Sequence, residues 1–237
     1  MPDQSLTLEM TEFLYLHGSV LTGFADLTIL PSDIRQQMPF GIVFALPINA
    51  DILATLLMGP TREYAAEYVR LNNELNIIGY QCVNYLTHLG YLASMQGSTL
   101  DVIDTTTYAT PLPHKTVATR AGLGWIGKSA LLVTKEFGSA IRFNTILTNA
   151  PLNVGIPIEQ SMCGDCVDCL RACPGGAPSG KTWHVELTRE DFFDASACAR
   201  TAKQLSDHQG ITRIICGRCI GACPWTQRYL SHLQSAI

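Results

Sequence analysis

The sequence has little charge, and no part of it is suited to a membrane or a nucleic acid. Only 15% of the 237 residues are charged and the formal net charge is -4, so no basic excess marks a DNA-binding surface. No apolar run approaches the ~18 residues of a spanning helix, and the first residues lack the pattern of a secretory signal. We therefore expect a cytoplasmic protein with no membrane or DNA partner, whose cysteines stay reduced.

Cysteine is almost missing from the first two thirds of the chain. Residues 1–158 contain Cys82 alone, whereas residues 159–237 contain the other eight cysteines. From residue 161 onward, short segments are punctuated by cysteine, glycine and proline, a texture typical of small units organised around metal. We therefore predict an α/β (α+β) domain over residues 1–158 and a cysteine-rich domain over residues 159–237.

Hydrophobic patterns predict the main elements of the first domain. Residues 40–48 are apolar nearly throughout and bounded by prolines, as expected of a strand covered on both faces. Apolar residues recur at steps of three and four over residues 61–89, which predicts a long amphipathic helix with Cys82 as a buried structural thiol. Residues 130–134 and 141–148 are predicted to form a hairpin with a turn near Gly138.

Two related cysteine motifs carry the clearest chemical signal. The first is Cys163-x2-Cys166-x2-Cys169-x3-Cys173-Pro174, and the second, Cys216-x2-Cys219-x3-Cys223-Pro224, repeats its ending with Cys198 as the displaced cysteine. In such motifs three thiolates hold one iron-sulfur cluster, and the cysteine before proline reaches the neighbouring cluster. This rule predicts two 4Fe-4S clusters, with the ligand sets Cys163, Cys166, Cys169, Cys223 and Cys173, Cys198, Cys216, Cys219.

Zinc and disulfides are the alternatives to iron and sulfide. Zinc ribbons use paired CxxC knuckles and need neither a third cysteine three residues on nor the x3-Cys-Pro ending. A disulfide framework requires an oxidising compartment. Both alternatives are therefore less favoured than two clusters that transfer electrons one at a time.

A glycine-rich loop at residues 122–129 (GLGWIGKS) matches two nucleotide-binding patterns, GxGxxG and GxxxxGK[ST]. Both patterns require a buried strand before the loop and a helix after it, whereas here a helix-like stretch precedes and an apolar strand follows. We therefore interpret Gly122, Gly124 and Gly127 as letting the backbone approach something bulky, with Trp125 as a flat contact. One hypothesis to be tested is an iron-sulfur ATPase that binds nucleotide at this loop.

With these motifs, the sequence resembles the epoxyqueuosine reductases, whose more distant relatives are the reductive dehalogenases. The similarity lies in residues 120–128 (RAGLGWIGK), 146–152, 163–174 and 216–225 (CGRCIGACPW). The resemblance implies a nitroreductase-like N-terminal domain, a bicluster ferredoxin-like module and a cobalamin between them. The residues expected at the cofactor are His114, Gly122, Gly124, Trp125, Gly127 and Lys128.

The resemblance also implies an activity. The clusters would pass electrons from a low-potential donor, such as ferredoxin or flavodoxin, to the cobalamin, which would reduce a substrate. A flavin is the less favoured cofactor. The tRNA-modifying members usually continue with a helical-repeat domain, whereas this chain ends at Ile237 and is acidic, which argues against modified tRNA and favours a small-molecule substrate.

Two residues ahead of the glycine loop are candidates for proton transfer. In the tRNA-modifying enzymes, an aspartate fourteen residues before the loop's first glycine is thought to supply a proton, and dehalogenases use a tyrosine. Counting back from Gly122 leads to Tyr108, which we name as the candidate catalytic residue. The alternative is an ordinary buried tyrosine with a paired hydroxyl.

His114 is a candidate for cofactor binding or proton exchange. The alternative is a helix cap or a surface contact.

The preferred hypothesis is an anaerobic oxidoreductase in which two 4Fe-4S clusters feed electrons to a cobalamin. Its rival is an electron carrier that passes electrons from two clusters to a partner protein and has no substrate of its own. The large N-terminal domain with its glycine loop favours the enzyme, because a simple ferredoxin needs no such extra mass.

Overall fold

The computed structural model describes residues 2–97 and 106–235 and divides into two compact units. One, here called the sheet unit, comprises Met1–Leu46, Leu71–Leu123 and Arg142–Ile158. The other, here called the cysteine unit, comprises Pro47–Arg70, Gly124–Ile141 and Glu159–Ile237. The cysteine unit therefore draws on two segments ahead of residue 159, and the second of them includes most of the glycine loop.

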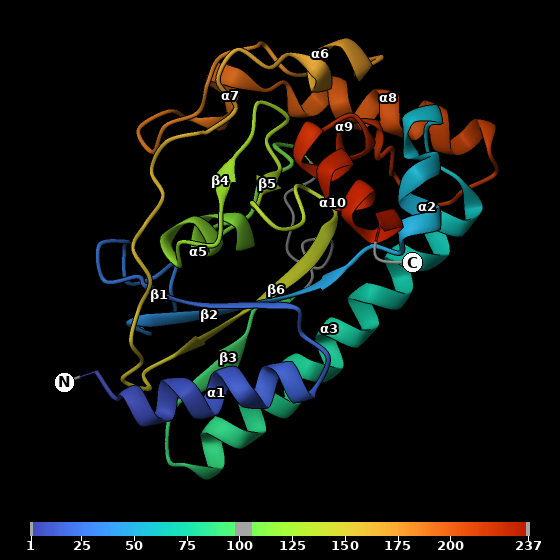
Figure 1. The fold of residues 1–237 in the computed structure, drawn as a ribbon. Helices are drawn as coiled ribbons and strands as arrows, with labels where there is room; N and C mark the ends of the chain where they lie inside the picture. The colour runs from blue at the N-terminus through green and yellow to red at the C-terminus, as the bar shows by residue number, and fades with distance from the viewer. Residues whose placement is uncertain (1, 98–105, 236–237) are drawn as a thin grey trace. The chain divides into compact units, whose positions relative to one another are not determined.

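A four-stranded sheet in the order β1-β2-β6-β3 forms the centre of the sheet unit (Figure 1). The strands are β1 (Leu21–Asp26), β2 (Phe40–Pro47), β3 (Ala93–Met95) and β6 (Ile141–Thr148). β1 runs antiparallel to β2 with Leu21 opposite Ala45, and β3 runs antiparallel to β6 with Ala93 opposite Thr148. Six consecutive residues of β2 are buried, which confirms the predicted strand covered on both faces.

Helices cover both faces of this sheet (Figure 1). They include α1 (Gln4–Leu16), α3 (Arg62–His88) and α5 (His114–Arg120). A side chain added at Gly41 of β2 would meet Val117 of α5, whereas Phe44 of the same strand lies against Gly79 of α3. Successive residues of a strand point to opposite faces, so α5 covers one face and α3 covers the other. The sheet unit is thus a mixed α+β structure.

The long helix α3 confirms the amphipathic pattern predicted for residues 61–89. Its stripe at Leu75, Ile78, Cys82 and Leu86 is buried, and burial raises the pKa of the Cys82 thiol to about 12, so that this cysteine stays neutral. Phe13 of α1 stacks on Tyr85 of α3 with ring centroids 4.8 Å apart. Within residues 2–97 and 106–235, no helix is both long and apolar enough to cross a membrane.

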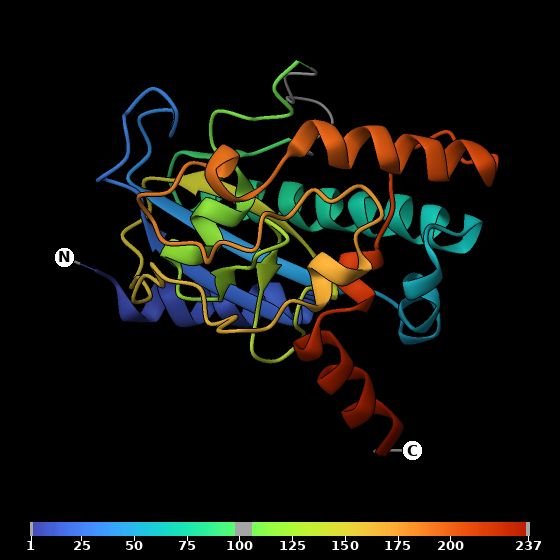
Figure 2. The same ribbon diagram turned by 90° about the horizontal axis from the view of Figure 1, so that it is seen from above.

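Short helices build most of the cysteine unit, and α8 and α10 are the longest of those that follow residue 159 (Figure 2). The elements are α2 (Ala50–Thr55), η1 (Leu56–Met58), α6 (Asp168–Ala172), α7 (Arg189–Phe192), α8 (Ala195–His208), α9 (Arg218–Gly221) and α10 (Pro224–Ser235). α9 packs against α2, η1, α6 and α10. In α8, the buried Ser206 hydroxyl donates to the Ile215 carbonyl at 2.9 Å, which ties the segment that leads to Cys216 to the helix that carries Cys198.

The predicted hairpin of residues 130–134 and 141–148 is wrong. β5 (Leu132–Val133) pairs with β4 (Trp125–Ile126) in a separate two-stranded sheet, while β6 joins the large sheet. The chain does turn at Gly138, where φ is 58°, but the backbone N–H of Ser139 donates to Thr226 of α10 at 3.1 Å. The apolar pattern identified two strands, but it held no information on their partners.

Candidate metal centre

Eight cysteines of the cysteine unit lie on loops and at helix ends. Cys163 and Cys166 precede α6, Cys169 lies in α6, and Cys173 lies at its end. Cys198 lies in α8. Cys216 precedes α9, Cys219 lies in it, and Cys223 follows it. The Cys166 N–H donates to the Cys163 carbonyl at 3.1 Å in a turn where Gly164 has φ 51°. Such tight turns bring thiols that are close in sequence onto one side of a loop. All eight thiols are free and partly exposed.

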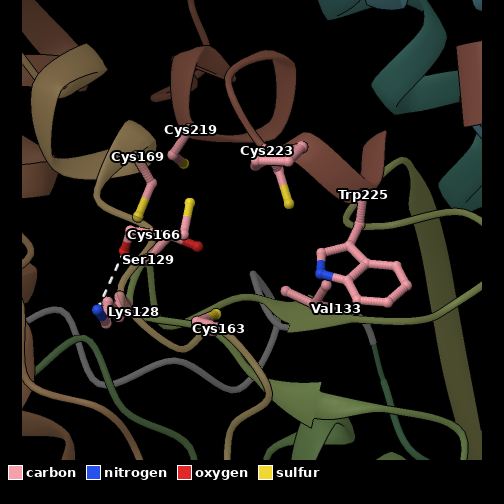
Figure 3. A pocket seen from close by; sticks show the side chains of 11 residues that line it. Lys128, Ser129, Val133, Cys163, Cys166, Cys169, Cys219, Cys223 and Trp225 are labelled. Atoms are coloured by element: carbon pink, nitrogen blue, oxygen red, sulfur yellow. Dashed lines mark hydrogen bonds between the residues drawn. The ribbon is translucent and has the colours of Figure 1, made fainter. Parts of the chain in front are cut away.

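The first set of thiols surrounds a cavity of about 90 Å³. In Figure 3, the sulfur atoms of Cys163, Cys166, Cys169 and Cys223 point into this common space. Three of these cysteines come from the first motif and the fourth comes from the second, 54 residues after Cys169 by the sequence numbering. A single water needs only ~10–15 Å³ of such volume, so the cavity admits a group of several atoms.

The effects of neighbouring thiols on one another's pKa identify the same four cysteines. Burial, together with the neighbouring Cys163, Cys166 and Cys223, raises the pKa of Cys169 to about 12, which favours the neutral thiol. Cys223 in turn has its pKa raised by burial and by Cys163. The crossing of Cys223 to the first motif is therefore present in the tertiary structure.

The second set brings together the remaining four cysteines. Burial raises the pKa of Cys198 to about 11, with Cys173 and Cys216 adding to the effect. Burial also raises the pKa of Cys219, with Cys198 and Cys216 as its strongest thiol neighbours and Cys169 and Cys173 next. Cys219 also lines the first cavity, so the two sets lie side by side.

The two groups of four thiols offer the donor chemistry of metal clusters with thiolate ligands. Thiolates, not thiols, bind metal, so metal binding must displace protons from these groups. Four thiols around a cavity larger than one ion fit a polynuclear group such as a 4Fe-4S cluster. The x3-Cys-Pro endings send Cys173 and Cys223 away from their sequence neighbours, as that type of cluster requires.

The lysine of the glycine loop forms part of the first cavity. Lys128 is 5% exposed, and its Nζ donates to the carbonyls of Gly164 at 2.7 Å and Cys166 at 3.0 Å. In a phosphate-binding loop this lysine would instead point at a phosphate. A helix, α5, precedes the loop, and the strand β5 follows it, as the sequence order predicts.

Two tryptophans pack beside this cavity. Trp125 is fully buried and meets Trp225 edge to face, with ring centroids 5.2 Å apart. The contact of Trp125 with a cofactor stays a prediction. Trp225 lines the cavity, and the guanidinium of Arg228 lies 4.5 Å from its ring centroid. Trp225 follows the Cys-Pro ending directly, and this adjacency is the sequence signal that could have identified it as a cavity residue.

The predicted loop glycines allow close approach to the chain's own backbone. A Cβ at Gly124 would collide with the carbonyl of Val133, and a Cβ at Gly122, where φ is 75°, would lie 2.6 Å from the Ile156 oxygen. At Gly127 a Cβ would lie 2.8 Å from the Val133 side chain, and the nearest backbone atom, the Leu131 oxygen, would be 3.6 Å away. At Gly122 and Gly124 the close approach is thus to the chain's own backbone, while contact of these glycines with a cofactor stays a prediction.

Tyr108 and His114 lie in the sheet unit. Tyr108 is half-buried and has φ 52°, a left-handed conformation that is unusual for an aromatic residue. His114 is neither a helix cap nor a plain surface contact, because Pro113 occupies the cap position of α5 and the His114 Nδ1 atom is shielded from water without a hydrogen-bond partner. Burial lowers the pKa of His114 to about 4, so the ring is neutral at pH 7.

Two further polar atoms without partners lie on the same face of the sheet as His114. They are Nε2 of Gln96 and Oγ1 of Thr145, which belong to neighbouring strand segments joined by the bond from Gln96 N–H to the Thr145 carbonyl, 2.8 Å. His114 packs on Phe143, two residues before Thr145, and bonds with the Gly97 backbone. Nothing in the sequence pattern indicated Gln96 or Thr145.

Known proteins share sequence with this chain. An epoxyqueuosine reductase of Salmonella typhimurium is 32% identical over 139 residues, which cover 56% of this chain and 33% of that protein. The enzyme of Escherichia coli is 28% identical over 190 residues, covering 77% and 46%. The chain resembles the epoxyqueuosine reductases. This confirms the resemblance inferred from the motifs, although the chain spans half or less of the length of these curated relatives and no protein-family model matches it.

Solved structures share the fold. An epoxyqueuosine reductase with an epoxyqueuosine-modified tRNA-Tyr stem loop matches with a TM-score of 0.62 and 20% identity, over 94% of this chain and 66% of that chain. A reductive dehalogenase described in terms of B12-dependent dehalogenation matches with a TM-score of 0.69 and 16% identity, over 96% and 33%. The chain therefore has the fold that these two kinds of reductase share.

Replacing Gly124 by alanine tests the close approach inside the glycine loop. Gly124→Ala forces a Cβ against the Val133 backbone, so we expect it to destabilise the protein by about 1–3 kcal/mol. Gly127→Ala is the matched control, since its close contact is with a side-chain methyl of Val133 and not with backbone. Thermal unfolding followed by circular dichroism should give Gly124→Ala a lower melting temperature than Gly127→Ala. Equal melting temperatures would contradict the close backbone contact at Gly124.

Proposed function

We propose that this protein is an iron-sulfur reductase in which two 4Fe-4S clusters deliver electrons to a cobalamin that reduces a substrate. The observation that carries the proposal is the crossed grouping of the thiols, with Cys223 beside the first motif and Cys173 beside Cys198 and Cys216. We assign the ligand sets accordingly: Cys163, Cys166, Cys169, Cys223 and Cys173, Cys198, Cys216, Cys219. In this proposal the cysteine unit is ferredoxin-like and the sheet unit nitroreductase-like.

Two observations support a cobalamin. The first is the similarity to epoxyqueuosine reductases, together with the fold shared with a protein of B12-dependent chemistry. The second is the group of unpaired atoms at Gln96, His114 and Thr145, because a buried polar atom without a partner is costly. The amide groups of a corrinoid both donate and accept hydrogen bonds, as these three atoms require. When bound, the cobalamin supplies a metal that accepts electrons and reduces the substrate.

We assign Tyr108 as the proton donor to the substrate. Its left-handed backbone costs roughly 1–3 kcal/mol in a residue other than glycine, and such strain clusters at functional sites. A phenol can release a proton to a reduced substrate and recover it from water. His114 would remain a neutral hydrogen-bonding group, because its lowered pKa leaves it without a proton to give at pH 7.

The substrate itself has two candidates. A solved relative holds an epoxyqueuosine-modified tRNA stem loop, which supports the same nucleoside in tRNA. The formal net charge of -4 works against a polyanion and supports a small molecule. Reduction assays with modified tRNA and with the free nucleoside separate these candidates. The alternative function, an electron carrier without a substrate, requires neither the corrinoid nor Tyr108.

The first experiment is anaerobic purification followed by iron, sulfide and cobalt analysis, with cobalamin offered in solution. We expect about eight irons per chain, which is four for each cluster, and a change in the visible spectrum as cobalamin binds. About eight irons without corrinoid binding would instead support the electron carrier. Two zinc ions per chain would refute both.

The crossing of ligands gives a second prediction. Cys173→Ser should impair the cluster assigned to Cys198, Cys216 and Cys219 and spare the one assigned to the neighbours of Cys173 in sequence. Iron content should fall toward about four per chain, since each cluster holds four irons, and Cys82→Ser serves as the control for a cysteine outside both sets. Loss of the cluster of Cys163, Cys166 and Cys169 instead would refute the assignment.

Tyr108→Phe tests the proton donor. The change removes only the hydroxyl, so we expect full iron content and unaltered cobalamin binding. Substrate reduction should fall by about 10²-fold or more, the range for a lost general acid. Tyr91→Phe, another partly exposed tyrosine of the sheet unit, is the matched control. Unchanged turnover in Tyr108→Phe would exclude the assigned role.

A further inference from the structure

Lys128 is a buried lysine whose side chain does not point where the lysine of a phosphate-binding loop would point. The loop offers the lysine of a phosphate-binding sequence, yet the side chain extends inside the cysteine unit to the turn between Cys163 and Cys166. Its two acceptors, the carbonyls of Gly164 and Cys166, belong to the first cysteine motif. The side chain therefore links the glycine loop to the backbone that presents two of the four thiols.

A buried ammonium group needs compensation for its lost hydration. The two carbonyls at 2.7 and 3.0 Å provide part of it. Among the described residues, no carboxylate forms an ion pair with Lys128. The remaining neighbour is the cavity that Lys128 lines together with Cys163, Cys166 and Cys169. A group that completes the charge balance in this cavity is therefore an anion.

We propose that Lys128 is a positioning residue for the first 4Fe-4S cluster: its ammonium group holds the Gly164–Cys166 turn in place, and its charge raises the reduction potential of that cluster relative to the second. This inference rests on the proposed function, because it takes a cluster with four thiolate ligands as the occupant of the cavity. A reduced cluster is more negative than an oxidised one, so a nearby buried cation stabilises the reduced state.

The effect should be selective for one cluster. Lys128 lines the cavity of Cys163, Cys166, Cys169 and Cys223, whereas Arg218 lies between Cys216 and Cys219 of the second set. Each proposed cluster thus has its own basic residue. Removing one of these charges should shift the potential of its own cluster more than that of the other.

The test compares three single variants by redox titration of the anaerobically purified protein, followed by electron paramagnetic resonance. Lys128→Met removes the charge and the donor at similar length, and Lys128→Arg keeps both. Lys203→Met is the control, since Lys203 is an exposed lysine of the same unit that pairs with Asp207. Repeating Lys128→Met with Cys198→Ser, which removes a proposed ligand of the second cluster, assigns the shifted signal.

At a fixed solution potential, we expect Lys128→Met to lower the ratio of reduced to oxidised first cluster about tenfold. This corresponds to a reduction potential lower by about 59 mV for a one-electron couple. Selective loss of that cluster, with rescue in Lys128→Arg, would equally support the inference through its positioning part. Eight irons with both potentials unchanged in Lys128→Met would overturn it, as would an equal shift in Lys128→Arg. Absence of iron from the unaltered protein would overturn the proposed function and, with it, this inference.

Discussion

The cysteine unit depends on the convergence of thiols from separate segments into two neighbouring groups. Cys223 must cross from the second motif to the first, and Cys173 must cross in the opposite direction. The crossing links α6, α8 and α9, which lie far apart in the sequence. Metal-thiolate bonds would add to the packing that holds these segments together. The proline after each crossing cysteine directs the chain away from its own motif and so makes the exchange possible.

Close backbone contact is the second constraint on this unit. The glycine loop runs so near to β5 that Gly124 has no room for a side chain, and the same loop delivers Lys128 to the turn of the first motif. Because the loop lies this close, one wall of the cavity comes from Gly127, Lys128 and Ser129, which precede Cys163 by 36 to 34 positions. The glycines of the two nucleotide-binding patterns thus serve here to bring backbone segments close together.

In the sheet unit, helices bury both faces of the sheet, and the strand β2 is apolar. Polar atoms in such a place need partners, and most have them: Asn144, for example, donates to Asn76 of α3 at 3.2 Å. The three atoms of Gln96, His114 and Thr145 are exceptions on the α5 face. These three unpaired atoms distinguish the α5 face of the sheet from the α3 face, where Asn144 is paired with Asn76.

The sequence by itself determined the long helix and the buried strand, because each is encoded by local spacing: a period of 3.6 and a continuous apolar run. The crossing of the cysteines is a prediction from the fixed Cys-x3-Cys-Pro ending. Only the tertiary structure decided the partners of β5 and β6, the direction of the Lys128 side chain and the grouping of Gln96 with His114 and Thr145. These depend on contacts between residues tens of positions apart, which local periodicity does not specify. Trp125 shows the same limit, because its burial depends on packing against Trp225, 100 positions later in the sequence.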